Sequence, residues 1–380
     1  MSFTDKELII SLLIFAASVT FTPRKFIPPV SVSFLLGFLL IYSPYSAAVF
    51  ILSSLFTYFI FNLKREQVIL PGIIFLVFIF LLFKIPEFGS LDNPLLIWGY
   101  PVGLSYFMVR HIHFLFEVFK ENTNEMQFLD YVCYAGFFPA FFTGPIHRLP
   151  EFSNDLKSGS PTSENISAGF ERILYGYVKI VFLSNYLVNN WFTFRIESLH
   201  LTHPYFYQYL DCIRYGANLY FQFSGYTDIA IGVSLIAGFK LKENFNFPFL
   251  AKNINEFWKR WHISLSDWCR DYVFKPVYAN SRIFAVSILL TMLAIGLWHE
   301  FSLRYVIWAL YHGLGIAIWQ YFDKNKKFRF TDEQKFLKSA SAVISVFVTV
   351  NFVILSFAIT KDELTARSIS AIGRLFNFGL

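Results

Sequence analysis

Residues 68–83 read VILPGIIFLVFIFLLF, an apolar stretch without a charged side chain, and such stretches decide the fold class of this chain. Its length is close to the roughly 20 apolar residues that a helix needs to cross about 30 Å of hydrocarbon. Similar runs occur at about 8–21, 26–42, 45–62 and 95–119. We therefore expect five membrane spans in the first third of the chain, with the first run kept as a span rather than cleaved.

The composition of the whole chain indicates a polytopic membrane protein. Its 380 residues are 55% hydrophobic and 21% aromatic, with 49 Phe, but only 15% are charged. Ordinary soluble chains carry about a quarter charged residues, so a water-soluble globule is excluded. The net charge of +6 fits the excess of cytoplasmic Lys and Arg that orients membrane proteins, so we expect a lipid bilayer and no nucleic acid as partner.

The apolar run 128–146 differs from the first five runs. Basic residues flank both of its ends, at Lys120 and at His147-Arg148, so the charge rule places both ends on the cytoplasmic side. Its Pro139 and Pro145 break helical hydrogen bonds, which membrane depth tolerates only where protein or water covers the backbone. The sequence therefore predicts a re-entrant segment here instead of a span.

The second half of the chain adds further apolar runs. Spans are expected at about 168–192, 205–238, 283–299, 302–322 and 339–360, which brings the total to nine to eleven. Between Lys240 and Arg282 charges, tryptophans and prolines are concentrated, and no span is visible there. We predict an all-α polytopic membrane protein that forms one membrane domain over residues 1–380.

The stretch Asn255–Asp271, NEFWKRWHISLSDWCRD, has the periodicity of an amphipathic helix with its tryptophans on one side and its basic residues on another. Such a helix is typical of an anchor at the membrane interface. His262 lies on the tryptophan side. It is either a hydrogen-bonded core histidine or a catalytic group that faces an internal cavity, since ionisable residues at membrane depth often mark function.

His299 directly follows the apolar run Ile283–Trp298, and with Glu300 it interrupts a nearly continuous membrane stretch. Burial disfavours the imidazolium form, so a buried ring stays neutral and can accept a proton as a general base. A short wet loop between two helices would explain the same residues. His312 follows within the next apolar run, and we expect it to pack between helices.

Other common reaction centres find no support in the sequence. No HExxH, GxSxG, Walker or dinucleotide-binding motif is present. His111 and His113 are two residues apart on a predicted helix and point in different directions, which argues against a metal site. Cys133, Cys212 and Cys269 lie far apart and form no CxxC pair, so we expect them to pack in the core.

Four segments taken together resemble the membrane-bound O-acyltransferase family, in particular its bacterial branch of alginate O-acetyltransferases and teichoic-acid D-alanyl transferases. They are PVGLSYFMVRHIHFLFEVFK (101–120), FFPAFFTGPIHR (137–148), LYFQFSGYTDIAIGVSLIAGFKLKENFNFPFLAKNINEFWKRWHISLSDWCRDYVFKP (219–276), and GLWHE with YHGLG (296–315). The resemblance covers about residues 95–320. It implies a ring of about nine to eleven transmembrane helices with re-entrant segments around a central tunnel.

The resemblance also implies roles for individual residues. His299 corresponds to the catalytic histidine of the family and His262 to its second motif histidine. The family often has glycine where this chain has Glu300, whose carboxylate would either raise the basicity of the imidazole or cap a helix. The candidates for substrate binding are Arg148, Asn255, Arg260, Tyr226, Asp228 and Glu300, with Lys259 and Arg270 as further cations for donor phosphates. Each cation is equally explained as ordinary topology charge.

The implied function is that of an O-acyltransferase in the bacterial cytoplasmic membrane. It would move a short acyl group, acetyl first and D-alanyl second, to a hydroxyl of an exported cell-surface polysaccharide or teichoic acid. The donor would be acetyl-CoA or an acyl-phosphopantetheine carrier protein, with no permanently bound cofactor and with an extracytoplasmic partner protein. The alternative is a proton-coupled transporter or flippase that uses intramembrane histidines.

Overall fold

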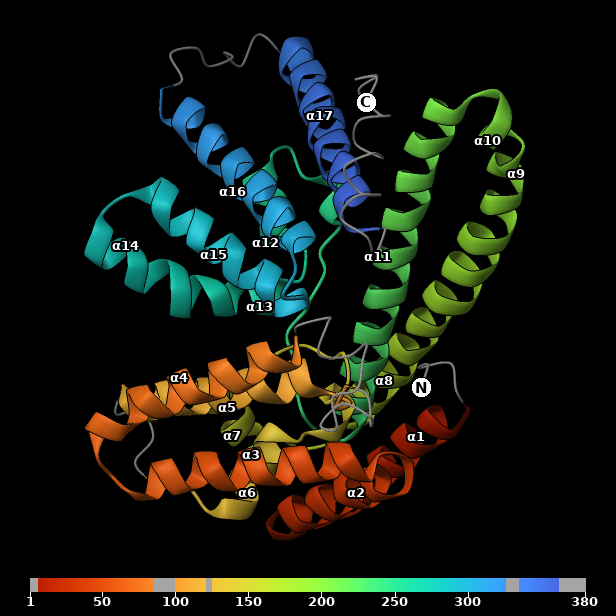
Figure 1. The fold of residues 1–380 in the computed structure, drawn as a ribbon. Helices are drawn as coiled ribbons and strands as arrows, with labels where there is room; N and C mark the ends of the chain where they lie inside the picture. The colour runs from red at the N-terminus through yellow and green to blue at the C-terminus, as the bar shows by residue number, and fades with distance from the viewer. Residues whose placement is uncertain (1–5, 85–99, 121–124, 326–334, 362–380) are drawn as a thin grey trace, which may run out of the picture. The chain divides into compact units, whose positions relative to one another are not determined.

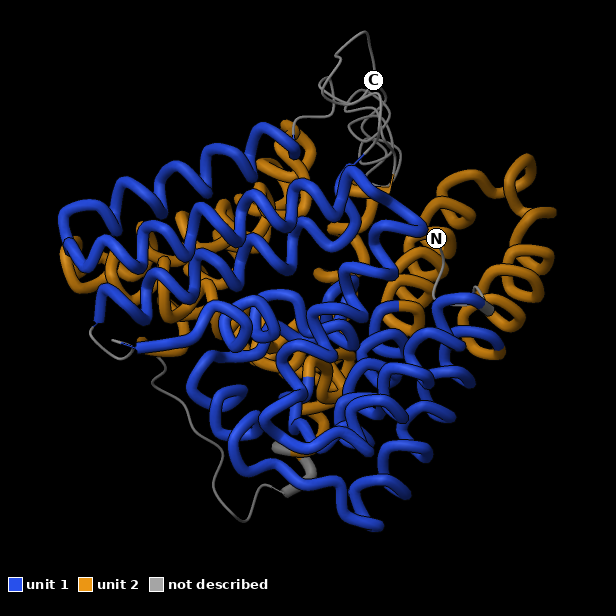
Figure 2. The backbone as a smooth tube through the Cα atoms, turned by 90° about the horizontal axis from the view of Figure 1, so that it is seen from below, with its two compact units in different colours: residues 1–181, 223–243 blue, residues 182–222, 244–380 orange. Residues whose placement is uncertain are grey.

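A computed structural model of the chain describes residues 6–84, 100–120, 125–325 and 335–361. These residues form helices and turns without a strand, so the all-α prediction is confirmed (Figure 1). They divide into two compact units, coloured separately in Figure 2. Unit 1 comprises Met1–Val181 and Phe223–Glu243, and unit 2 comprises Phe182–Gln222 and Asn244–Leu380. One acyltransferase domain over residues 1–380 stays a prediction.

The helices of unit 1 follow the predicted apolar runs closely. They are α1 (Lys6–Thr20), α2 (Ile27–Tyr42), α3 (Pro44–Asn62), α4 (Glu66–Phe83), α5 (Leu104–Phe119), α6 (Phe128–Ala135), α7 (Leu149–Ser158) and α8 (Ser163–Tyr177), with 3₁₀ turns η1 (Arg24–Phe26) and η3 (Phe138–Ala140). The start of the run predicted at 95–119 lies partly outside the described residues, and α5 is its described part. The first five apolar runs thus form helices over most of their described residues.

Two long elements continue from one unit into the other, the π-helical segment η4 (Val178–Phe192) and α11 (Pro204–Ile236). The remaining helices of unit 2 are α9 (Thr193–Glu197), α10 (Leu199–Thr202), α12 (Ile254–Arg260), α13 (Ile263–Cys269), α14 (Lys275–Ser281), α15 (Phe284–His299), α16 (Leu303–Lys324) and α17 (Lys335–Thr360), with the short η5 (Pro248–Leu250) and the π-helical η6 (Arg270–Phe274). Short helices, from η5 to α14, form the region in which the sequence predicted no span.

Several of these helices suit a bilayer by length and composition. Among the described residues four segments are long and apolar enough to cross a membrane: Arg24–Tyr42, Pro44–Asn62, Glu66–Phe83 and Ser339–Thr360. Helices dominate because backbone polar groups find no water in hydrocarbon and must bond within their own segment. The polytopic prediction is confirmed, while the count of nine to eleven spans and their ring arrangement stay predictions.

The segment after α6 breaks its helix inside the core of unit 1, as its prolines predict. Carbonyl groups freed by the break are buried, and buried backbone polar groups must find partners. Arg110, whose side chain is fully buried, donates from Nη1 to the carbonyl of Ala135 at 2.8 Å and from Nη2 to that of Ala140. His147 donates from Nε2 to the carbonyl of Tyr134 at 3.0 Å. These bonds replace the helical ones.

The histidines of α5 hold the same region and belong to the structure of the core. His113 accepts a hydrogen bond at Nε2 from the backbone N–H of Leu149 at 3.1 Å. His111 lies between the hydroxyl groups of Tyr131, 2.6 Å from its Nδ1, and Ser53, 3.1 Å from its Nε2. Both rings are buried. Their partners among the described residues are protein groups.

A glycine seam brings α8 and the last part of α11 together in unit 1. Gly169 and Gly176 on α8 face Gly232 and Gly225 on α11. A Cβ atom on Gly232 would lie 2.5 Å from the carbonyl oxygen of Gly169, and one on Gly176 would lie 2.5 Å from that of Gly225. Small residues at such an interface let two membrane helices approach closely and gain packing that lipid alone does not supply.

The predicted helix Asn255–Asp271 is wrong in one respect, because it is broken at Trp261 and His262. α12 ends at Arg260 and α13 begins at Ile263. The break has a physical cause in a distant segment: Asn244 accepts the backbone N–H of Ile263 at its carbonyl oxygen, at a distance of 2.9 Å. A continuous helix would have kept that N–H for an intrahelical bond. The tryptophan-rich stretch is therefore two short helices with a turn between them.

Candidate active site

The two histidines that the sequence singles out come together in unit 2. α15 ends at His299, and the turn between α12 and α13 carries His262. The indole of Trp298 contacts both rings, with centroid distances of 5.5 Å to His262 and 4.9 Å to His299. Two imidazoles from separate segments thus share one small region.

The backbone at His262 is strained and held in place from outside. Its φ of 46° and ψ of 51° are left-handed, a conformation that costs a residue with a side chain about 1–2 kcal/mol. The side chain of Asn244 stabilises it by accepting bonds from the N–H and the hydroxyl of Ser264 at 3.1 and 2.8 Å. Asn244 is completely buried. Such over-determined strain is common at functional sites, where it aims a side chain.

The exposure of the two rings differs, and the difference separates their possible roles. His299 is half-buried, whereas His262 is only 1% exposed. A general base must reach the proton of a reactant, so an exposed edge is required. The geometry therefore suits His299 for contact with a reactant and His262 for a position behind it.

Two tryptophans next to the site, Trp308 and Trp258, contact His312. The indole of Trp308 lies 5.9 Å from His299 and 4.8 Å from His312, measured between ring centroids. Trp258 donates from Nε1 to Nδ1 of His312 at 3.3 Å, so that nitrogen is the acceptor and the ring proton is on Nε2. Nε2 then donates to the hydroxyl of Ser356 at 3.0 Å. His312 packs between helices, as expected.

Glu300 belongs to a second group of side chains next to His299, which we call the clamp. Its carboxylate accepts bonds from Nε of Arg304 at 2.9 Å and from Nη2 of the same guanidinium. The guanidinium lies 5.5 Å from the ring centroid of Tyr305, and the Tyr305 ring is stacked on His299 at 5.5 Å and 19°. The clamp Glu300–Arg304–Tyr305 thus packs an aromatic ring against the imidazole of His299.

Comparison with known proteins places this site in a family. Residues 105–360 match the profile of the membrane-bound O-acyltransferase family, and these residues include every element of the site. The chain belongs to this family. Family membership favours acyl transfer over the transporter alternative.

Three curated relatives illustrate which proteins this chain is similar to. The chain is 32% identical over 287 residues to the "Probable alginate O-acetylase AlgI" of Pseudomonas putida, covering 73% of this chain and 56% of the relative. It is 31% identical over 281 residues to the "Teichoic acid D-alanyltransferase" of Bacillus subtilis, covering 69% of each. It is 27% identical over 384 residues to the "Peptidoglycan O-acetyltransferase" of Helicobacter pylori, covering 82% and 70%. The chain spans about half the length of the alginate O-acetylases that it matches.

The other site residues predicted from the sequence lie in two different units of the structure. Asn255 and Arg260 are on α12 in unit 2, where Arg260 donates from Nη2 to Glu256 at 2.6 Å. Arg148, Tyr226 and Asp228 belong to unit 1, outside the unit that holds both histidines. Their part in substrate binding stays a prediction.

Asp228 already has partners of its own. The carboxylate, 4% exposed, accepts bonds from Nε of Arg172 at 2.7 Å and from Nζ of Lys179 at 2.5 Å. Arg172 also pairs with Glu243. All four residues lie along the glycine seam of unit 1 or next to it. The network explains the buried charge without a substrate.

Sequence reasoning missed two groups of residues that shape the site. The spacing of four between Glu300 and Arg304 is typical of an ion pair within one helix. Here Glu300 has extended backbone before α16, so the turn between the two helices brings the pair together. Asn244 gave no such signal, because its partners Ile263 and Ser264 are far along the chain.

Proposed function

We propose that this chain moves a short acyl group, acetyl in preference to D-alanyl, from a cytoplasmic thioester to a hydroxyl of an exported glycopolymer. The family assignment supports the reaction class. The names of the relatives from Pseudomonas putida and Helicobacter pylori support acetyl, and that of the Bacillus subtilis relative supports D-alanyl. The bacterial cytoplasmic membrane is the proposed location, with an extracytoplasmic partner protein.

One observation carries the proposal, the half-buried His299 beside the fully buried His262. Neutral His299 accepts the proton of the acceptor hydroxyl while its oxygen attacks the thioester carbonyl. The new C–O bond forms, the C–S bond breaks, and the proton passes to the leaving thiolate. General-base catalysis contributes typically about 10²–10⁴-fold.

The neighbours of His299 have positioning roles in this proposal. Trp298 contacts both the ring of His262 and that of the proposed base, and Tyr305 stacks on the ring of His299. Glu300 holds Arg304 against Tyr305 rather than acting on a reactant. Arg148 and Arg260 are the proposed contacts for phosphates of acetyl-CoA or of a phosphopantetheine carrier, since guanidinium groups bind phosphate well.

Reconstitution of the full chain in vesicles tests the proposal. Labelled acetyl-CoA or acyl-loaded carrier protein is supplied on one side and glycopolymer fragments on the other, and label on the polymer is measured. His299→Ala should reduce transfer at least about 10²-fold. The exposed His200→Ala is the matched control and should transfer normally. Transfer by His299→Ala within a few-fold of the wild type would remove the proposed base, and solute flux without acyl transfer would favour a transporter.

A further inference from the structure

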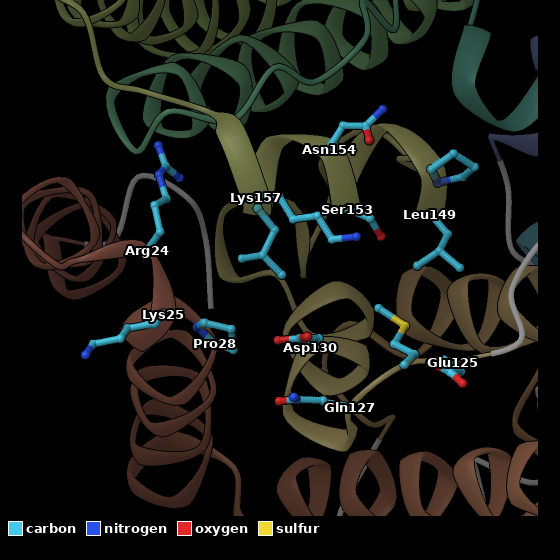
Figure 3. Close-up of a pocket in the computed structure, with 13 residues that line it drawn as sticks. Arg24, Lys25, Pro28, Glu125, Gln127, Asp130, Leu149, Ser153, Asn154 and Lys157 are labelled. Carbon is cyan, nitrogen blue, oxygen red and sulfur yellow. The ribbon is translucent and has the colours of Figure 1, made fainter.

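A second concave site lies entirely in unit 1. It is a pocket of about 830 Å³ bordered by the start of α2, the start of α6, and α7 (Figure 3). Pockets of about 300–1,000 Å³ are of the size that binds small ligands. None of its lining residues takes part in the proposed acyl transfer.

Both signs of charge line this pocket. The cations are Arg24, Lys25 and Lys157, and the carboxylates are Glu125 and Asp130. Figure 3 shows Asp130 and Gln127 pointing from the start of α6 toward the helix that carries Lys25. The charged residues of the lining therefore come from different elements, and in this view the Lys25 side chain extends away from Asp130.

These charges are not neutralised by ion pairs in the part of the chain that the structure describes. Asp130, Glu125, Lys25 and Lys157 have no oppositely charged atom within ion-pair distance there. Nearby carboxylates on α7 do have partners, as in the pair of Glu151 with Lys242 at 2.5 Å. A ligand that carries both a positive and a negative group can pair with both kinds of side chain, so such a ligand is expected to bind this pocket most tightly.

The environment of Asp130 agrees with a cationic neighbour. Burial raises the pKa of this carboxyl, and the charge of Lys157 partly opposes the rise. A ligand ammonium next to Asp130 would favour its ionised form. A ligand with only one sign of charge would leave the lining groups of that same sign without a partner.

We propose that this pocket binds the headgroup of a zwitterionic phospholipid, with its phosphate on the cations and its ammonium on the carboxylates. Phosphatidylethanolamine is the simplest lipid of this kind. The apolar side chains of Pro28, Met126 and Leu156 also line the pocket and suit the glycerol and acyl stem. The charge rule places the loop at Arg24 and Lys25 on the cytoplasmic face, where headgroups lie.

Lipid binding to the purified full chain tests this inference without any need for acyl transfer. Affinity is measured by calorimetry for soluble short-chain phosphatidylethanolamine, for the matched phosphatidylglycerol, which lacks the ammonium, and for free phosphoethanolamine. We expect phosphatidylethanolamine to bind at least tenfold more tightly than phosphatidylglycerol. Equal affinities, or no binding of either lipid, would overturn the proposal. Free phosphoethanolamine that binds as tightly as the lipid would make this a site for a soluble ligand and would also overturn it.

Two variants test which side chains bind the ammonium group of the lipid and which bind its phosphate. Asp130→Asn should remove the preference for phosphatidylethanolamine while binding of phosphatidylglycerol persists, and Lys157→Met should weaken both lipids at least fivefold. Lys157→Met keeps the test decisive if Asp130→Asn does not fold. The exposed controls Glu164→Gln and Lys324→Met remove one charge each elsewhere and should bind like the wild type. A preference that survives in Asp130→Asn would contradict the assignment.

Discussion

The ion pairs of Asp228 give a quantitative test of what this carboxylate does. Arg172 joins two acids of very different exposure, since Asp228 is 4% exposed and Glu243 is 52% exposed. Lys179 is a second partner of Asp228 alone. Neutralising each acid in turn, by Asp228→Asn and Glu243→Gln, therefore compares a buried with an exposed partner of the same guanidinium.

The expected costs differ by several-fold. Removing one partner of a buried ion pair costs about 3–5 kcal/mol, because the remaining charge is left buried and uncompensated. Arg172 and Lys179 are each 30% exposed, so water recovers part of that loss. We expect Asp228→Asn to lower the free energy of unfolding by about 2–3 kcal/mol, below the fully buried range. An exposed pair contributes about 0–1 kcal/mol, which is the expectation for Glu243→Gln.

Equilibrium unfolding of the full chain in mixed micelles measures both values. The double variant Asp228→Asn with Lys179→Met should recover part of the loss, since no unpaired ammonium remains beside the amide. Equal stability of the two single variants would refute the reasoning. Unchanged stability of Asp228→Asn together with lost acyl transfer would do the same, and it would support the substrate-binding role that the sequence suggested.

Two further variants probe packing. Tyr305→Leu removes the ring stacked on His299, and since an aromatic pair contributes about 0.5–1.5 kcal/mol, kcat for acyl transfer should fall about two- to tenfold while KM changes less. Tyr305→Phe keeps the ring and should stay near the wild type, so an equal fall in both would argue against ring support. Gly232→Ala puts a Cβ 2.5 Å from the carbonyl oxygen of Gly169 and should destabilise unit 1 by about 1–3 kcal/mol. Gly37→Ala, with nothing within 4 Å, is the control, and similar unfolding midpoints for the two glycine variants would contradict the seam.

Much of the fold could be predicted because lipid makes secondary structure a local property. A run such as 68–83 cannot leave its backbone unbonded in hydrocarbon, so it becomes a helix whatever its neighbours do. The prolines of the 128–146 run predicted its break for the same local reason. His299 stood out because a polar residue between two apolar runs is expensive at membrane depth.

Tertiary structure alone decided how the site is assembled. Periodicity predicted one helix over Asn255–Asp271, but the backbone of Asn244 takes the N–H of Ile263 and turns His262 toward Trp298. Asp228 likewise accepts its bonds from Arg172 and Lys179, which are 56 and 49 residues away in the chain. Helical pattern depends on residues three and four apart, whereas these bonds join segments that are distant in the chain. Only folding brings such partners within hydrogen-bond distance, so the sequence singled out the two histidines and the fold determined their neighbours.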